Sequence, residues 1–182
     1  MFGVRRWISM INLNFDIESR NCSMNKEISL RKATMTDCEQ IHKMQVESFS
    51  ALLDKYKDYG TNPAAEPTER IEQRVAQEFT DYYFISLNSD DIGVIRIVRL
   101  STSICRISPM FILPQHQDMG YAQQAIFKVE SLYPQAKRWE LDTIKQESKL
   151  CYLYEKMGYT ATGKEENIQD GMTIISYSKA TP

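Results

Sequence analysis

The stretch Phe111-Ile112-Leu113-Pro114-Gln115-His116-Gln117-Asp118-Met119-Gly120-Tyr121-Ala122 connects an apolar run to an amphipathic segment through a short polar loop. Apolar or small residues then recur with the i, i+3, i+4, i+7 spacing of a helix, at Ala122, Ala125, Ile126, Val129 and Leu132. This pattern predicts a strand that ends at Leu113-Pro114, a loop, and a helix from Gly120 to Tyr133.

A helix that begins directly after such a loop favours anion binding. The N–H groups of its first turn have no partner within the helix, and the helix dipole places about half a positive charge there. Gly120 has no Cβ, so a ligand can approach the main chain closely, and Ala122 is also small. We therefore expect a phosphate or pyrophosphate held mainly by backbone amides.

Two common phosphate motifs are absent from the sequence, the P-loop G-x-x-x-x-G-K-[ST] and the dinucleotide fingerprint G-x-G-x-x-G. What remains is Gln117-x-x-Gly120-x-Ala122, which resembles the pyrophosphate motif [RQ]-x-x-G-x-[GA] of the GNAT acyl-CoA N-acyltransferases. About 30 residues later, the run Leu153-Tyr154-Glu155-Lys156-Met157-Gly158-Tyr159 resembles a second element of that family, L-Y-E-K-x-G-F/Y. The alternative is an ordinary helix N-terminus followed by an ordinary helix C-cap.

The resemblance implies that acetyl-CoA is the co-substrate and that no metal is needed. The strand before the loop would pair with the pantetheine arm, and the loop amides would hold the pyrophosphate. The residues concerned are Phe111, Ile112, Leu113, Gln117, Asp118, Met119, Gly120, Tyr121, Ala122 and Gln123. The backbone N–H that polarises the thioester carbonyl would come from Met110, Phe111 or Ile112.

The reaction implied is direct acyl transfer to an amine, in which positioning is supported by acid–base catalysis. Tyr154 occupies the position where the family often has its general acid, a phenol near the coenzyme sulfur. The alternative is a core tyrosine, because Leu150, Leu153, Tyr154 and Met157 form one apolar stripe.

The general base is harder to assign. Many family members carry a glutamate on the strand before the loop, and here that strand holds no carboxylate. Glu140 and Asp142 alternate with Trp139 and Leu141 on the next strand, so both point to one face and could anchor or deprotonate an amine. They could equally be carboxylates hydrogen-bonded to nearby backbone. Glu147 stands where the family often has an asparagine that contacts the coenzyme.

Acceptor contacts in the family usually come from the segment between the first two helices. Here that segment, residues 56–67, contains Tyr56, Asp58 and Tyr59, with Tyr56 and Tyr59 as the expected substrate-binding residues. The alternative is a solvated loop with aromatic anchors.

Composition narrows the class of protein. The chain of 182 residues has the length of one ordinary domain, and its formal charge of −2 with a pI near 5.8 argues against a broad nucleic-acid-binding face. Four widely spaced cysteines without a C-x-x-C pair, and only two histidines, argue against a zinc site and suit reduced thiols in the cytosol. No apolar run approaches the roughly 18 residues of a membrane span.

The N-terminus contains Arg5-Arg6 before a short apolar run, which superficially resembles a signal peptide. Asn12, Asn14 and Asp16 interrupt that run, and no small-residue cleavage site follows. We interpret residues 1–23 as an extension outside a domain that spans residues 24–182. A short helix or an added strand packed on that domain is the alternative.

The hydrophobic pattern predicts a mixed α+β fold, and the order of the expected elements resembles the GNAT topology over about residues 27–179. That resemblance implies a mixed, mostly antiparallel central sheet flanked by helices. Strands are expected near residues 28–31, 82–87, 92–100, 103–113, 138–142, 159–163 and 172–179, and helices near 34–53, 67–79, 120–133 and 148–157.

The function that these features imply is an N-acetyltransferase that moves an acetyl group from acetyl-CoA to a primary amine. The acceptor would be a small molecule or a peptide, and a homodimer is left open. A non-catalytic acyl-CoA-binding sensor or interaction domain on the same fold is the alternative, because fold alone does not determine function.

Overall fold

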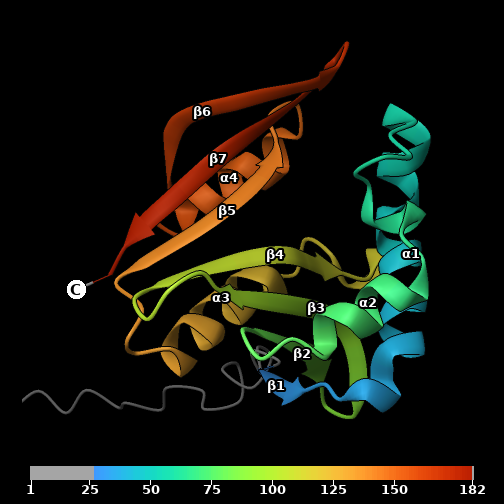
Figure 1. Ribbon diagram of the computed structural model, residues 1–182, viewed down its shortest axis with the longest axis vertical. Helices are drawn as coiled ribbons and strands as arrows, with labels where there is room; N and C mark the ends of the chain where they lie inside the picture. Colours follow the sequence, from blue (N-terminus) through green and yellow to red (C-terminus); the bar gives the residue numbers. More distant parts are fainter. Residues whose placement is uncertain (1–26, 182) are drawn as a thin grey trace, which may run out of the picture.

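Seven strands form one sheet, in the order β1-β2-β3-β4-β5-β7-β6, in the computed structural model, which describes residues 27–181 (Figure 1). The strands are β1 (Ile28–Lys32), β2 (Thr80–Leu87), β3 (Asp90–Arg99), β4 (Ile104–Ile112), β5 (Arg138–Ile144), β6 (Thr160–Gln169) and β7 (Met172–Ala180). The α-helices are α1 (Cys38–Tyr56), α2 (Thr68–Val75), α3 (Tyr121–Leu132) and α4 (Ser148–Lys156). Short 3-10 turns are η2 (Met35–Asp37), η3 (Pro63–Ala65) and η4 (Pro114–His116).

Every neighbouring pair of strands is antiparallel except β4 and β5, which run parallel. This confirms the predicted α+β fold with a mostly antiparallel sheet. The expected N-terminal extension, residues 1–23, lies outside the described residues.

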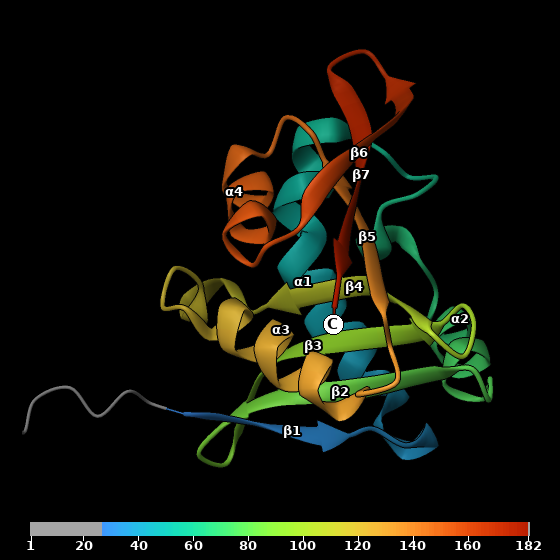
Figure 2. The ribbon, with the colours of Figure 1, turned by 90° about the vertical axis from the view of Figure 1, so that its left-hand side faces the viewer.

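Each face of the sheet packs against a different pair of helices (Figure 2). One face packs against α3 and α4, through a core that includes Ile97, Ile107, Ile126 and Trp139. The other face packs against α1 and α2, through residues that include Phe84. A strand side chain therefore packs either against α3 and α4 or against α1 and α2, depending on the face of the sheet to which it points.

The sheet splits between β4 and β5. These two strands pair only at their beginnings, where Ile104–Arg106 meets Arg138–Glu140, and they diverge beyond that point (Figure 1). A bulge lies just ahead on β4, because Ser108 and Pro109 together face the single residue Arg96 of β3. A bulge bends its strand and increases the local twist, so it helps to turn β4 away from β5.

Helix α1 bridges the two halves of the sheet. Phe49 packs edge-on against Phe111 of β4, with ring centroids 5.6 Å apart. Tyr56, at the other end of the helix, is buried with Ile144 of β5 and Met172 of β7.

Two expected helical positions are wrong. The helix expected at residues 67–79 would have placed Phe79 in its last turn, but that helix ends at Val75 and Phe79 is 48% exposed. The Phe79 carbonyl instead accepts a hydrogen bond from Arg99 N, so its backbone already belongs to the sheet. Leu132 was predicted on the buried stripe of α3, but it is exposed because Tyr133 fills the core there.

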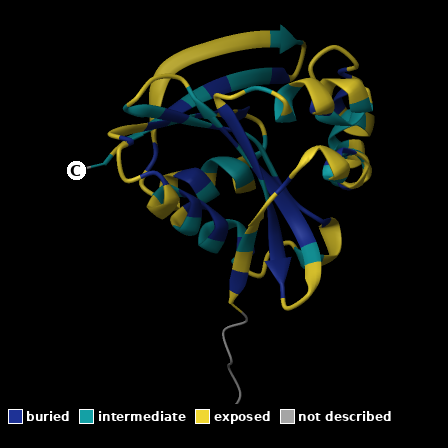
Figure 3. Cartoon of the chain, turned by 60° about the horizontal axis from the view of Figure 1, so that its bottom comes forward, coloured by how far each residue is buried: buried dark blue, intermediate teal, exposed yellow. Residues whose placement is uncertain are grey.

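The strand expected at residues 159–163 is longer than predicted, since β6 continues to Gln169 along β7. Most of β6 is exposed, whereas the central strands are buried (Figure 3). None of the helices in residues 27–181 is long and apolar enough to cross a membrane.

Candidate active site

The split leaves one edge of β4 free. Among the described strands, β5 pairs with β4 only as far as Arg106, so the β5-facing peptide groups of residues 107–112 have no strand partner. Such an edge can form a strand-like ladder with an extended amide ligand.

Backbone alternation shows which groups face this edge. Leu113 N donates to Ile92 O of β3 at 2.8 Å. Because neighbouring residues of a strand point their peptide groups to opposite sides, Phe111 also faces β3, and Met110 and Ile112 face the open edge. Of the three residues expected to supply a carbonyl-polarising N–H, the geometry therefore leaves Met110 and Ile112.

The predicted anion loop is a tight turn that ends at an open helix N-terminus. Asp118 (φ +60°) and Gly120 (φ +80°) are both left-handed, and an added Cβ at Gly120 would meet nothing within 4 Å. The first hydrogen bond of α3 runs from Gln124 N to Gly120 O at 3.2 Å. The N–H groups of residues 121–123 therefore have no acceptor within the helix, and the N-cap Gly120 has no side chain to supply one.

The side chains of this loop do not all face a ligand. Gln117 Nε2 donates to Ile112 O at 2.8 Å, which fastens the loop to the end of β4. Asp118 forms an exposed ion pair with Lys149 at 3.0 Å, which offsets the negative charge of Asp118 near the helix N-terminus. Met119 is exposed and Tyr121 is buried in the core, so Tyr121 can contribute only its main chain to binding.

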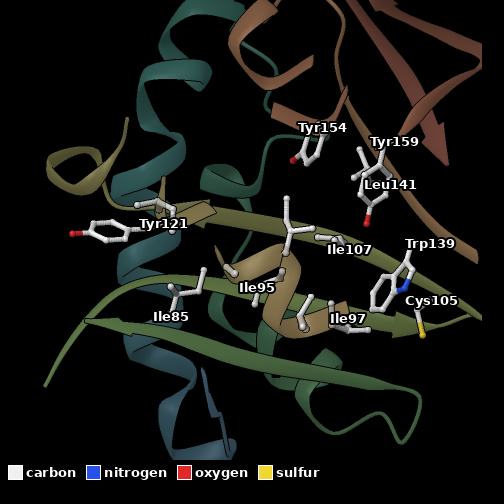
Figure 4. Packing of buried hydrophobic residues seen from close by; sticks show 14 of the residues in the cluster. Ile85, Ile95, Ile97, Cys105, Ile107, Tyr121, Trp139, Leu141, Tyr154 and Tyr159 are labelled. Atoms are coloured by element: carbon white, nitrogen blue, oxygen red, sulfur yellow. The ribbon is translucent and has the colours of Figure 1, made fainter. Parts of the chain in front are cut away.

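Tyr154 lies in the core between α4 and the sheet. It packs against Tyr159 and Tyr177, with ring centroids 6.2 and 6.3 Å away. Its hydroxyl points away from the Tyr159 ring, on the side of β4 (Figure 4). Burial raises the pKa of Tyr154 to about 12, so the phenol stays protonated at neutral pH. Tyr154 is therefore a core residue with a protonated hydroxyl, and its role as general acid stays a prediction.

Glu140 and Asp142 share one face of β5, as their alternation with the buried Trp139 and Leu141 requires. They line a pocket of about 270 Å³ between β5, β7 and β6, together with Arg106 and other residues. Neither carboxylate is free. Glu140 pairs with Arg138 at 2.9 Å, and Asp142 pairs with Arg106 across the start of the split.

The segment expected to contact the acceptor contains three different environments. Tyr56 is not in a loop but ends α1, where it is buried because it packs on Ile144 and Met172. Asp58 is buried and accepts hydrogen bonds from the Gly60 and Thr61 amides, so it stabilises a turn. Tyr59 is 68% exposed, so of these three residues it is the one that a ligand can reach.

Glu147 has a role that the sequence did not indicate. Its Oε1 accepts hydrogen bonds from Lys55 Nζ at 2.6 Å and from the Tyr56 hydroxyl at 2.5 Å. Glu147 therefore joins the end of α1 to the start of α4. Only the three-dimensional proximity of positions about 90 residues apart shows this.

Comparison with known proteins places this geometry in a family. A family model described as an acetyltransferase (GNAT) domain matches residues 36–181. The chain therefore belongs to the GNAT acetyltransferase family, as the two motifs predicted, and it is an acyltransferase of the type that acts on amino groups. No curated protein sequence matches the chain.

Solved structures with the same fold include a chimera of spermidine N-acetyltransferase SpeG from Vibrio cholerae and hSSAT. Its TM-score is 0.69 at 16% identity, with 85% of this chain and 95% of that chain covered. RimL, a ribosomal L7/L12 alpha-N-protein acetyltransferase in complex with coenzyme A, has a TM-score of 0.67 at 12% identity, with 85% and 94% covered. The microcin C7 self-immunity acetyltransferase MccE, in complex with acetyl-CoA and AMP, has a TM-score of 0.66 at 19% identity, with 85% and 93% covered.

Proposed function

We propose that this protein transfers an acetyl group from acetyl-CoA directly to the primary amine of a small-molecule or peptide acceptor. The observation that carries the proposal is the unpaired edge of β4, which leads straight to the open N-terminus of α3 at Gly120. An extended amide arm can pair along that edge, and a pyrophosphate can accept from the N–H groups of residues 121–123. Two similar structures were solved with coenzyme A or acetyl-CoA, which supports this choice of ligand.

In this reaction the amine nitrogen attacks the thioester carbon, so a C–N bond forms and the C–S bond breaks. The N–H of Met110 or Ile112 polarises the carbonyl oxygen from the open edge of β4. Tyr154 gives its phenolic proton to the departing thiolate and regains one from solvent.

The proton lost by the amine needs an acceptor. Asp142 is better placed than Glu140, because it lies two residues beyond Glu140, which forms the last residue pair of β4 and β5 with Arg106. Since an ion pair with arginine makes a carboxylate a weaker base, Asp142 orients the amine and water carries the proton away.

One observation favours a second candidate, a non-catalytic acyl-CoA sensor, because both carboxylates on β5 are paired with arginines. Release of free thiol from acetyl-CoA, measured with a panel of amines, separates the two. Acetylation of an amine supports the enzyme. Tight acetyl-CoA binding in calorimetry without thiol release supports the sensor, and the lack of any binding rejects both.

We also propose that the protein works in the cytosol, which suits the free cysteines Cys38, Cys105 and Cys151.

A further inference from the structure

A cluster of polar side chains, two of them buried and four half-buried, lies on the α1–α2 side of the sheet, next to the bulge in β4. We call it the polar cluster; its members are Gln45, Ser48, Glu66, Arg74, Tyr82 and Arg96. Gln45 Nε2 donates to Pro63 O at 2.8 Å and lies 3.4 Å from Glu66 Oε2. Ser48 follows Gln45 by one turn of α1.

Arg96 brings a positive charge into this cluster without a carboxylate partner. Its Nε donates to Thr80 Oγ1 and its Nη1 donates to Ser108 O, both at 2.9 Å, and both acceptors are neutral. The guanidinium lies 5.7 Å from the centre of the Tyr82 ring. Burial lowers the pKa of Arg96, which reflects the cost of keeping this charge away from water.

The nearest acidic group is already engaged. Glu66 accepts two hydrogen bonds from Arg74, at 2.6 and 2.7 Å. The cluster therefore holds two guanidinium groups and one carboxylate, which leaves one positive charge unbalanced. Buried charges are normally paired, so an unbalanced one indicates a site for an anion.

Three polar atoms of the cluster also have no hydrogen-bond partner among the described residues. They are Gln45 Oε1, Ser48 Oγ and the Tyr82 hydroxyl. Gln45 is 0% and Tyr82 is 2% exposed, and the Arg74 guanidinium lies close to the Tyr82 hydroxyl. Buried polar atoms are rarely left unpaired, and one of these, the Tyr82 hydroxyl, belongs to the ring that lies beside Arg96.

We propose that the polar cluster binds an acceptor that carries a carboxylate as well as its amine, such as an amino acid or the end of a short peptide. Arg96 pairs with the carboxylate, the hydroxyls of Ser48 and Tyr82 donate to it, and Gln45 Oε1 accepts from an N–H of the acceptor. This inference rests on the proposed acetyltransferase function and specifies its acceptor.

The position of the cluster fits this role. Arg96 is bonded to Ser108 O, in the bulge of β4, and Met110 lies two residues further along. The residue that anchors Arg96 is therefore on the same strand as Met110, whose N–H polarises the thioester in the proposed reaction. The unbalanced positive charge also disfavours a polyamine in the same place.

The test uses pairs of acceptors in which one member carries a carboxylate and the other carries a neutral carboxamide in its place. Acetylation rates are measured for the twenty L-amino acids and their carboxamides, with spermidine as a polyamine probe and phosphoethanolamine as a phosphate-bearing amine. We expect kcat/KM for the best amino acid to exceed that for its carboxamide and for spermidine at least tenfold. The carboxamide has the less basic amine, so its intrinsic reactivity works against this result.

Variants of the full chain assign the preference to Arg96. We expect Arg96→Gln to abolish the difference between acid and amide while the KM for acetyl-CoA stays the same, and Arg96→Lys to retain part of it. Arg99→Gln is the matched control, because Arg99 lies on the same strand but pairs with Asp81. If Arg96→Gln fails to fold, Tyr82→Phe is measured in its place. We then expect kcat/KM to fall for the amino acids and to stay the same for their carboxamides.

Several results would overturn the proposal. One is a higher kcat/KM for carboxamides, spermidine or phosphoethanolamine than for amino acids. Another is an equal fall of kcat/KM for amino acid and carboxamide in Arg96→Gln. The third is binding of acetyl-CoA without acetylation of any carboxylate-bearing amine. Calorimetry with acetyl-CoA separates a failure of this proposal from a failure of the proposed function. If the chain does not bind acetyl-CoA at all, the proposed coenzyme site itself is wrong.

Discussion

Tyr154 provides a direct test of the chemistry, because its raised pKa of about 12 keeps a proton available at neutral pH. Tyr154→Phe removes the hydroxyl and leaves most of the ring's packing against Tyr159 and Tyr177. We expect kcat to fall by about 10²-fold or more with little change in the KM for acetyl-CoA, because only proton donation is lost.

Steady-state kinetics of Tyr154→Phe should be read beside those of Tyr152→Phe, since Tyr152 is an exposed tyrosine on the same helix. Tyr152→Phe should leave kcat unchanged. An unchanged kcat in Tyr154→Phe together with a lower Tm would show that this tyrosine only fills the core.

Gly120 provides a test of coenzyme binding. A valine at this position combines an unfavourable positive φ with a branched side chain that fills the open space over the loop. We expect the affinity for CoA to fall at least tenfold, about 1.4 kcal/mol, as measured by calorimetry on the folded variant.

Gly163→Val is the control for this effect. Gly163 also has a positive φ and open space around it, but it lies in β6, away from the loop. The backbone strain is therefore similar in both variants, and equal CoA affinity in the two would contradict a site at Gly120.

The sequence predicted the positions of some site residues but not the partners of others. Gly120 and Tyr154 stand in local motifs, so their places on a helix N-terminus and a helix face follow from spacing. The arginine partners of Glu140 and Asp142 were not predictable in this way, since Arg106 comes from another strand. Arg96 interrupts the apolar run of residues 92–100, and this was the signal in the sequence for its unusual environment.

The junction of α1 with α4 depends on pH through Glu147. Burial opposes ionisation of this carboxyl group, but hydrogen bonds from Lys55 and Tyr56 outweigh burial and lower its pKa from the ordinary value of 4.5. A lowered folded-state pKa gives stability that is present above 4.5 and is lost as the pH falls through the folded-state pKa. The ionised group therefore stabilises the fold at neutral pH.

We expect Glu147→Gln to lower the free energy of unfolding by about 1 kcal/mol at pH 7, because charge-assisted hydrogen bonds become neutral ones. The difference from the natural chain should narrow as the pH falls below 4.5 in urea denaturation. Glu165→Gln, which affects a more exposed pair with Lys145, should change stability little. A difference that is constant with pH would mean that Glu147 acts by packing and not by charge.

The contact between β3 and β4 depends on Gly93. A Cβ there would overlap the Phe111 carbonyl oxygen and come within 2.9 Å of Ile112 Cδ1. We expect Gly93→Ala to cost about 1–3 kcal/mol of stability and to lower the Tm, because the overlap involves backbone that cannot rotate away. Gly60→Ala, whose added Cβ would lie 3.6 Å from Asp58, should leave the Tm nearly unchanged.

Helices and strands were predicted well where the hydrophobic period was regular, as in the hairpin of β2 and β3 and in α3. The errors lie at ends. Tyr56 was placed in a loop because Gly60 and Pro63 follow it, but contacts with Ile144 and Met172 extend α1 to this residue. Tertiary packing of this kind is not visible in a local pattern.

The whole domain is expected to fold without the first 23 residues, because β1 begins at Ile28. A truncated chain that starts at Met24 should melt within a few degrees of the full chain and bind CoA with the same affinity. Thermal denaturation and calorimetry check this, and a large fall in Tm would place residues 1–23 in the folded core.

The short pairing between β4 and β5 leaves only three residue pairs between these two strands. We therefore expect β5, β6 and β7 to exchange their amide hydrogens with solvent faster than β2 and β3, although α1 and a shared core connect the two halves. A pantetheine arm bound along β4 would occupy the place of the missing ladder and tie the two halves together. Hydrogen exchange in β5, β6 and β7 should therefore slow when acetyl-CoA binds.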